Sequence, residues 1–495
     1  MSKAKPTPVA LEPNAEHQMF VEFSREKKDQ SFTTFRAASS IKSLKQSRKS
    51  LDDDEVEQND ESNEDEPQSR VDQLCSQFID RFELDLSRYH HLISIVTLIG
   101  GSMAVGALDG YVLPETQKHG TKIHADELTE IYGLSDNGFD IVIKQVRRAN
   151  EIAAGLDVLP SSTLLSLVAT FDSLTGDFVK EVLKAEPSKV KFSEKTITYR
   201  ELFQNGDISK ILNDAINTEV GQLLRGSHQD QIAYIEGLID TKISGHYDRL
   251  PNYLEIFERR NQFAHAAGLV TDYYLDKCRS FRYPIEGLKN GDQFLLDPKY
   301  LHRAVDYLTE FGILLSFAAW QKLGDGKSNP FSKLNSVCFE LIVKRRYKLA
   351  SYLLDFALHK QSCRTDDITK RMMQVNLANS YARLGKKEQA WKTLDELDWT
   401  ACSDDFKICV AAVRGDVEAV CKILPKAVAS NAIAKSALRS WPVFENVNES
   451  KDFAKAFEDV FLEPFQIELI PGNVVETIES AAEDDVIVDS QGSVH

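Results

Sequence analysis

The sequence predicts an all-α protein, built from a helical bundle followed by a short solenoid of α-hairpins. From about residue 69 to residue 285, apolar side chains recur at helical spacing, and Pro160, Pro187 and Pro251 separate the segments. Closer to the C-terminus, two segments resemble each other at an offset of 30 residues. Such an internal repeat is typical of stacked helical hairpins.

Composition divides the chain into five stretches. The first and last have too few apolar side chains to offset the loss of chain entropy on folding. The expected order is a disordered tail, first basic and then acidic (1–68), a helical domain (69–285), a helical connector (286–330), helical repeats (331–462) and an acidic tail (463–495).

The net charge of -17 is concentrated in the two tails. Ten carboxylates and no basic residue lie between Asp52 and Glu66, and six carboxylates with no Lys or Arg lie between Pro471 and His495. These sixteen carboxylates account for all but one unit of the net charge, so the rest of the chain, taken together, is close to neutral. The overall acidity therefore does not exclude a nucleic-acid partner.

Cysteine usage and the N-terminus favour a cytoplasmic protein. Seven cysteines are scattered without a CxxC motif or a spacing that suits zinc, which is typical of reduced thiols. Charged and polar residues fill the first fifty positions, where a signal peptide would be apolar. The sequence also lacks a P-loop, a dinucleotide fingerprint and a nucleophile elbow, so we expect no metal and no cofactor.

One uncharged segment, Leu92 to Leu108, is 17 residues long, at the lower limit for a membrane span. It contains Gly100, Gly101 and Gly106, and it is flanked by His90, His91 and Asp109 rather than by aromatic or basic anchors. We expect a buried core helix with a break at the glycines, and contact with a membrane is the less favoured interpretation.

The repeat consists of GKKEQAWKTL (385–394) and GDVEAVCKIL (415–424). Small residues precede the first copy, and the positions Ala378, Tyr381, Gly385, Ala390 and Leu394 have spacings of 3, 4, 5 and 4. This pattern resembles a tetratricopeptide unit, in which small residues lie where two helices touch and a glycine lies in the turn. The tryptophan and the terminal proline of that consensus are missing, so paired antiparallel helices are the firmer expectation.

Two charged residues occupy apolar helical stripes in the 69–285 domain. Arg260 completes a stripe formed by Tyr253, Ile256, Phe263 and Ala267. Asp172 completes a second stripe, formed by Leu165, Val168, Thr175, Val179 and Val182. Burying either charge alone would cost several kcal/mol, and pairing recovers much of that cost. We therefore expect Asp172 and Arg260 to meet, directly or through a neighbour.

The segment ERRNQFAHAAG, from Glu258 to Gly268, carries the most informative motif. Arg260, Asn261 and His265 form R-N-x-x-x-H, which resembles the R-x4-6-H signature of HEPN (higher eukaryote and prokaryote nucleotide-binding) domains. The preceding Arg259, the glycine three residues after the histidine and a later Tyr-Leu pair resemble the form found in bacterial defence proteins. The resemblance covers about residues 69–285.

The resemblance implies a homodimeric, metal-independent ribonuclease that leaves a 2′,3′-cyclic phosphate and a 5′-OH. His265 would serve as base or acid, Arg260 would hold the phosphate, and Asn261 would orient the phosphate or the imidazole. Asp172 would hold Arg260 in place. Since one helix cannot wrap these side chains around one phosphate, a two-fold axis would assemble a composite site. Glu258 and Arg259 are expected to be exposed helix charges.

Three functions remain open. The first is an endoribonuclease, with RNA as substrate and a protein partner bound through the helical repeats. The second is a noncatalytic adaptor that dimerises and binds proteins or nucleotides, in which Arg260 would only fix helix register and His265 would be a core histidine. The third is a membrane-active effector that uses residues 92–108. Retention of both Arg260 and His265 favours the ribonuclease, and no feature indicates DNA specificity.

Overall fold

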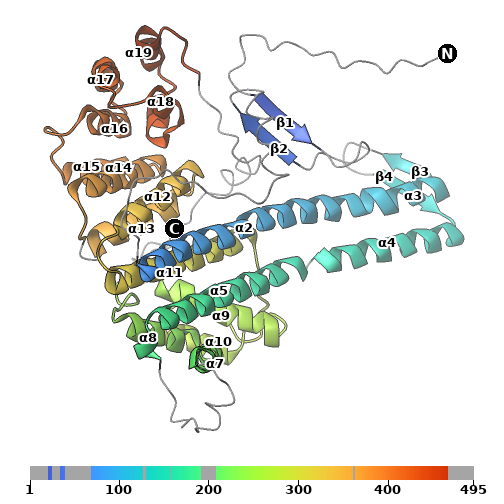
Figure 1. Ribbon diagram of the computed structural model, residues 1–495. Coiled ribbons are helices and arrows are strands. Elements are labelled where there is room, and N and C mark those ends of the chain that lie inside the picture. Colours follow the sequence, from blue (N-terminus) through green and yellow to red (C-terminus); the bar gives the residue numbers. More distant parts are fainter. Residues whose placement is uncertain are drawn as a thin grey trace, which may run out of the picture. The chain divides into compact units, whose positions relative to one another are not determined.

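The computed structural model describes residues 20–24, 34–38, 69–125, 130–156, 158–190, 208–360 and 363–466 (Figure 1). By internal contacts the chain separates into two units, Met1–Pro67 and Gln68–His495. In the first unit, β1 (Phe20–Ser24) pairs antiparallel with β2 (Thr34–Ala38). These ten residues, rich in aromatic and β-branched side chains, are ordered strands rather than the expected disordered tail. The rest of that prediction lies outside the described residues.

The second unit is helical, which confirms the all-α class. Its first part contains α2 (Arg70–Ala107), α4 (Asp136–Leu156), α5 (Val158–Ala185), α7 (Ile208–Leu223), α8 (His228–Ile239), α9 (Leu250–His265), α10 (Asp272–Ser280) and α11 (Pro298–Leu323). A π-helical turn (Leu108–Val112), α3 (Leu113–His119) and a two-stranded hairpin of β3 (Gly120–Ala125) and β4 (Glu130–Leu134) connect α2 to α4.

Helix α11 is the most thoroughly buried helix of this first part. Nearly every residue from Tyr300 to Trp320 is buried, and α2, α5, α8 and α9 pack on it. The sequence-based division made this stretch a connector, whereas it forms the centre of the core. Gly312 explains how α2 comes so close, because a Cβ at this position would lie 2.3 Å from the ring of Phe82.

The expectation of a buried helix broken at the glycines is wrong in two respects: residues 92–98 are mostly exposed, and the helix is not broken at Gly100 and Gly101. Helix α2 continues through Gly100 and Gly101 to Ala107. Ile93 is buried, whereas the side chains of Leu92, Ile95 and Leu98 are 40%, 50% and 63% exposed. This exposure follows from the packing of α2. Its N-terminal part packs on α5 and α11, whereas its C-terminal part runs beside α4 (Figure 1).

Within the described residues, one helical stretch, Asp136–Ala185, could cross a membrane by length and composition alone. It includes α5, in which Leu164, Leu167, Phe171 and Phe178 lie in the core. Since a core helix passes the same test as a membrane span, this finding is weak evidence for a membrane.

The second part of this unit is a series of helical hairpins. The helices are α12 (Pro330–Val343), α13 (Tyr347–Asp355), α14 (Asp367–Arg383), α15 (Lys387–Asp395), α16 (Asp404–Arg414), α17 (Val417–Ala429), α18 (Lys435–Ser440) and α19 (Lys451–Phe461). Gly385 and Gly415, the first residues of the two repeat copies, have φ of +74° and +68°. They lie in the turns between α14 and α15 and between α16 and α17, where a left-handed residue is required.

The hairpins are joined to the bundle through ion pairs and a continuous core. Lys333 Nζ lies 2.5 Å from Asp80 Oδ2, and Lys344 Nζ lies 2.9 Å from Glu83 Oε1, so α12 is tied to α2. At the other end, Phe465, the third residue of the expected acidic tail, packs on Phe453 and Phe457. The tail beyond residue 466 lies outside the described residues.

Gly312→Ala should lower the free energy of unfolding by about 2 kcal/mol or more, because the added methyl would overlap the Phe82 ring that both helices need for their contact. Chemical denaturation monitored by circular dichroism would measure it. The matched control is Gly237→Ala in α8, where nothing lies within 4 Å of the new Cβ and alanine favours the helix by roughly 1 kcal/mol. Equal stability of the two variants would contradict the close packing of α2 on α11.

Candidate functional site

Helix α9 carries the R-N-x-x-x-H motif and ends with it. Proline in its first turn favours the start, and His265 is the last helical residue. Ala267 and Gly268 then take φ of +51° and +77°, so Ala267 lies outside the helical stripe expected from the sequence. Gly268 is required there, because a Cβ would lie 2.7 Å from the side chains of Phe263 and Gln293.

Arg260 and Asp172 meet, as their places on two apolar stripes predict. Arg260 Nη2 lies 3.4 Å from Asp172 Oδ2, and both side chains are 26% exposed. The contact is long for a charge-assisted hydrogen bond. Arg260 Nε, moreover, is buried without a hydrogen-bond partner in the described part of the chain. Among the described residues, the guanidinium thus makes one ion pair, and most of its N–H donors have no acceptor.

His228 is a member of this cluster that the sequence did not reveal. Its Nε2 lies 2.9 Å from Asp172 Oδ1, the oxygen that Arg260 does not contact. Its ring stacks on Phe257, with centroids 3.4 Å apart and planes inclined by 13°. The preceding Ser227 caps α8 by accepting a hydrogen bond from the backbone N–H of Asp230, which sets the histidine at the first helical position. Asp172 therefore bridges α9 and α8.

Glu258 is half-buried beside Arg260, not an exposed charge as expected. Burial raises the pKa of its carboxyl, and Lys277, a hydrogen bond with Asn261, His228 and Arg260 partly oppose that shift. Its Oε2 is buried without a hydrogen-bond partner among the described residues. Asn261 thus contacts Glu258, one turn earlier on the same helix. A carboxyl with a raised pKa beside a guanidinium is a group that could exchange a proton.

Arg259 was also expected to be exposed and is instead part of a buried polar cluster. Its Nε lies 2.5 Å from Oε1 of Glu255, and its side chain is 12% exposed. The guanidinium lies over the rings of Phe294 and Tyr300, at 4.6 and 4.1 Å. The hydroxyls of Tyr274 and Tyr300 also donate to Glu255, at 2.7 and 2.9 Å. This cluster fixes α9 against α10 and α11 and has a structural role.

His265 stands apart from the other motif residues. It is exposed at the C-terminal end of α9, and within the described ranges no hydrogen bond or ion pair joins it to Arg260, Asn261 or Asp172. On an ideal helix, five residues correspond to a rotation of about 140°. One chain therefore brings together Asp172, Arg260, His228, Glu258 and Asn261, and leaves His265 on another side of α9 from Arg260, on the face that it shares with Asn261.

Comparison with known proteins adds no constraint: no family model, no curated protein and no solved structure matches the chain significantly. Across the part of the chain that the structure describes, no three His, Cys, Asp or Glu side chains converge as a metal site requires. The chemistry available in the cluster is thus that of a guanidinium, two carboxyls, an amide and an imidazole.

Asp172→Ala should lower the free energy of unfolding by about 1–2 kcal/mol, because it leaves both Arg260 and His228 without their shared acceptor. Arg260→Ala should cost less, since His228 still hydrogen-bonds to Asp172. Urea denaturation of the two variants would measure the difference.

Asp177→Ala is the matched control, because it removes the same side chain from the same helix. Asp177 pairs with Arg81 at 2.9 Å, and both side chains are more than 40% exposed. Exposed pairs contribute about 0–1 kcal/mol. If Asp172→Ala were no more destabilising than this control, the bridging role of Asp172 would be wrong.

Proposed function

We propose that this chain is a metal-independent endoribonuclease of the HEPN type, which acts as a homodimer in the cytoplasm. The observation that carries the proposal is the state of Arg260. It lies on an otherwise apolar stripe, is partly exposed, and makes one long contact that leaves its Nε without a partner. A purely structural arginine in such a place would be expected to have its donors satisfied.

The uncommitted donors of Arg260 suit a phosphate. A guanidinium has five N–H donors in a planar fork, which binds phosphate oxygens in bidentate fashion. Asp172, held from the other side by His228, keeps the fork in one orientation without saturating it. The same cation would stabilise the negative charge that develops on the phosphorane.

The reaction is transesterification within the RNA backbone. A base removes the proton of the 2′-OH, the 2′ oxygen attacks phosphorus, and the bond from phosphorus to the 5′ oxygen breaks. That oxygen takes a proton from an acid, which leaves a 2′,3′-cyclic phosphate and a 5′-OH. His265, exposed and free of other contacts among the described residues, is our choice for one of these proton-transfer roles. Asn261 would orient the phosphate or the imidazole.

A second copy of the chain would complete the site. The side chain of Arg260 points toward α5, whereas His265 is rotated by about 140° from Arg260 around the axis of α9. A two-fold axis close to the end of α9 would bring the His265 of each copy toward the Arg260 of the other.

The helical hairpins between Pro330 and Phe461 support a further element of the proposal, a protein partner. Their glycine turns and 30-residue repeat resemble tetratricopeptide units, whose stacked helices form extended binding surfaces. Such a partner would regulate the nuclease, as in a defence or stress effector. The same hairpins favour the alternative of a noncatalytic adaptor, and cleavage assays separate the two.

The purified full chain should cleave single-stranded RNA in the presence of EDTA. Arg260→Ala and His265→Ala should each reduce the cleavage rate by at least about 100-fold, because each removes a group that acts in the transition state. Gel analysis of labelled RNA, with end-group tests for the cyclic phosphate, would measure rate and chemistry together.

Two exposed residues outside the site provide the controls, Arg279→Ala and His246→Ala, which should cleave at the wild-type rate. Melting curves for all four variants would show that loss of activity is not loss of fold. Wild-type protein that cleaves no RNA at all would favour the adaptor.

The full chain should be a dimer at micromolar concentration, since the composite site needs two copies of α9. Light scattering coupled to size-exclusion chromatography would measure its mass against the 55.8 kDa of one chain. An RNA-cleaving protein that stays monomeric would show that the site is complete within one chain, with His228 or Glu258 in place of His265.

A further inference from the structure

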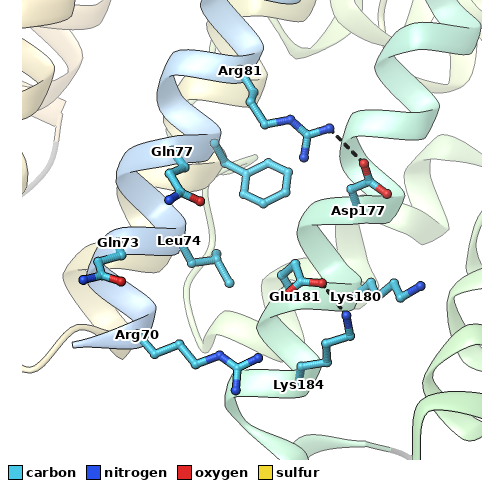
Figure 2. Close-up of a pocket in the computed structure, with 10 residues that line it drawn as sticks. Arg70, Gln73, Leu74, Gln77, Arg81, Asp177, Lys180, Glu181 and Lys184 are labelled. Carbon is cyan, nitrogen blue, oxygen red and sulfur yellow. Dashed lines mark hydrogen bonds and ion pairs between the residues drawn. The ribbon is translucent and has the colours of Figure 1, made fainter. Parts of the chain in front are cut away.

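A groove of about 430 Å³ lies between α2 and α5, apart from the Arg260 cluster. Figure 2 shows its two walls, one from each helix. Four cations line it, two on each helix: Arg70, Arg81, Lys180 and Lys184. Only two carboxylates, Asp177 and Glu181, accompany them, so the lining has an excess of two positive charges.

The positive charge is unevenly compensated along the groove. At one end Arg81 pairs with Asp177 at 2.9 Å. At the other end Lys184 pairs with Glu181 at 2.6 Å, and Arg70 lies across from Lys184 (Figure 2). Neither Arg70 nor Lys180 makes an ion pair in the described ranges. Arg70 and Lys184, which face each other at this end with only Glu181 paired to Lys184, attract an anion (Figure 2).

The groove is long rather than round. Arg70 and Arg81 are separated by eleven residues, or about 16 Å along α2. Gln73 and Gln77, both exposed, lie between them on the same wall and offer amide groups to a ligand. A single phosphate would contact one end only, whereas a chain of phosphates could contact both.

We propose that this groove binds the phosphate backbone of single-stranded RNA, as a second contact beside the cleavage site. The inference rests on the proposed ribonuclease function for the identity of the ligand. Cations on both walls bind the phosphates, and the two glutamines bind ribose hydroxyls.

Binding in the groove is independent of base sequence. Its floor is formed by Leu74 and Phe78, which are only 7% and 3% exposed. The guanidinium of Arg81 already lies over the Phe78 ring, 4.7 Å from its centroid. No aromatic face of this floor is open for a base to stack on, so the backbone supplies the contacts.

The groove and the cluster share helix α5. Asp172 and Asp177 are five residues apart, which is about 7.5 Å along the axis and a rotation of about 140°. A strand held in the groove therefore reaches the cluster with nucleotides that flank the groove. The groove holds the substrate, and Arg260 contacts the phosphate at which the strand is cut.

The test measures binding of a short fluorescent single-stranded 2′-O-methyl RNA to the full chain by anisotropy at several salt concentrations. This probe lacks the free 2′-OH, so it is bound without being cleaved. Arg70→Gln combined with Lys180→Gln should weaken binding about tenfold at low salt. This double variant should also reduce the magnitude of the slope of log binding constant against log salt concentration by about 1.4. Each lost phosphate contact on a single strand contributes about 0.7 to that slope.

Glu181→Gln provides a readout that a merely structural role would not produce. It frees Lys184 and raises the excess charge of the groove, so RNA should bind more tightly, by about threefold or more. The matched control is Lys387→Gln combined with Lys392→Gln, which removes two exposed cations from α15 and should leave binding unchanged. Melting curves check that every variant folds.

The outcomes separate this inference from the proposed function. If groove variants bind the probe like wild type while wild type cleaves ordinary RNA, the groove proposal is overturned and the nuclease stands. If the groove variants bind weakly but no RNA is cleaved, the groove stands and the nuclease does not. Tighter binding of polyglutamate than of RNA would overturn RNA as the ligand and indicate an acidic protein segment.

Discussion

The close approach of α2 to α11 at Gly312 is the constraint on which the rest of the helical unit depends. Because the Phe82 ring occupies the space of a missing Cβ, the two helices pack at a distance that no larger residue permits. Helix α11 also carries two carboxylates that orient its neighbours, the buried Glu310 and the partly buried Asp306. Glu310, fully buried, pairs with Arg249 at 2.5 Å, at the N-cap of α9. Asp306 pairs with Arg346, at the N-cap of α13.

These pairs matter because a buried charge without its partner is strongly unfavourable. They therefore specify where α9 begins and where the first hairpin docks. The start of α9 in turn sets which side chains face α5. Arg260 lies almost three turns further along the helix and reaches Asp172. The candidate site is thus positioned by packing at the centre of the bundle, while its own contacts are few and partly exposed.

Some residues of this site could be predicted from the sequence, and others could not. Asp172 and Arg260 could be paired in advance, because two charges on two apolar stripes have few other ways to be satisfied. His228 could not, since nothing in the sequence shows that α8 begins beside Asp172. Arg259 was wrongly expected to be exposed for a related reason. Its partner Glu255 lies one turn earlier on α9, but Tyr300, which covers its guanidinium, lies on α11, far away in the sequence. The all-α class followed from periodicity, whereas the central place of α11 depended on tertiary packing. Helix α2 also continues through Gly100 and Gly101, although the low helix propensity of glycine predicts that the helix ends there.

Helix α5 links the two places where we propose contact with RNA, the Arg260 cluster and the groove. Asp172 and its partners lie on one side of the helix, and Lys180 and Lys184 lie on the side that faces α2. A ligand that contacts both must turn around α5 within a few nucleotides. Double-stranded RNA has a stiff A-form geometry and presents its phosphates on a fixed helical surface, so it cannot make such a turn. A single strand can, because its backbone is flexible and its bases need no partner. In the proposed ribonuclease, the arrangement of charges around α5 would therefore select for unpaired RNA, without any contact that reads a base.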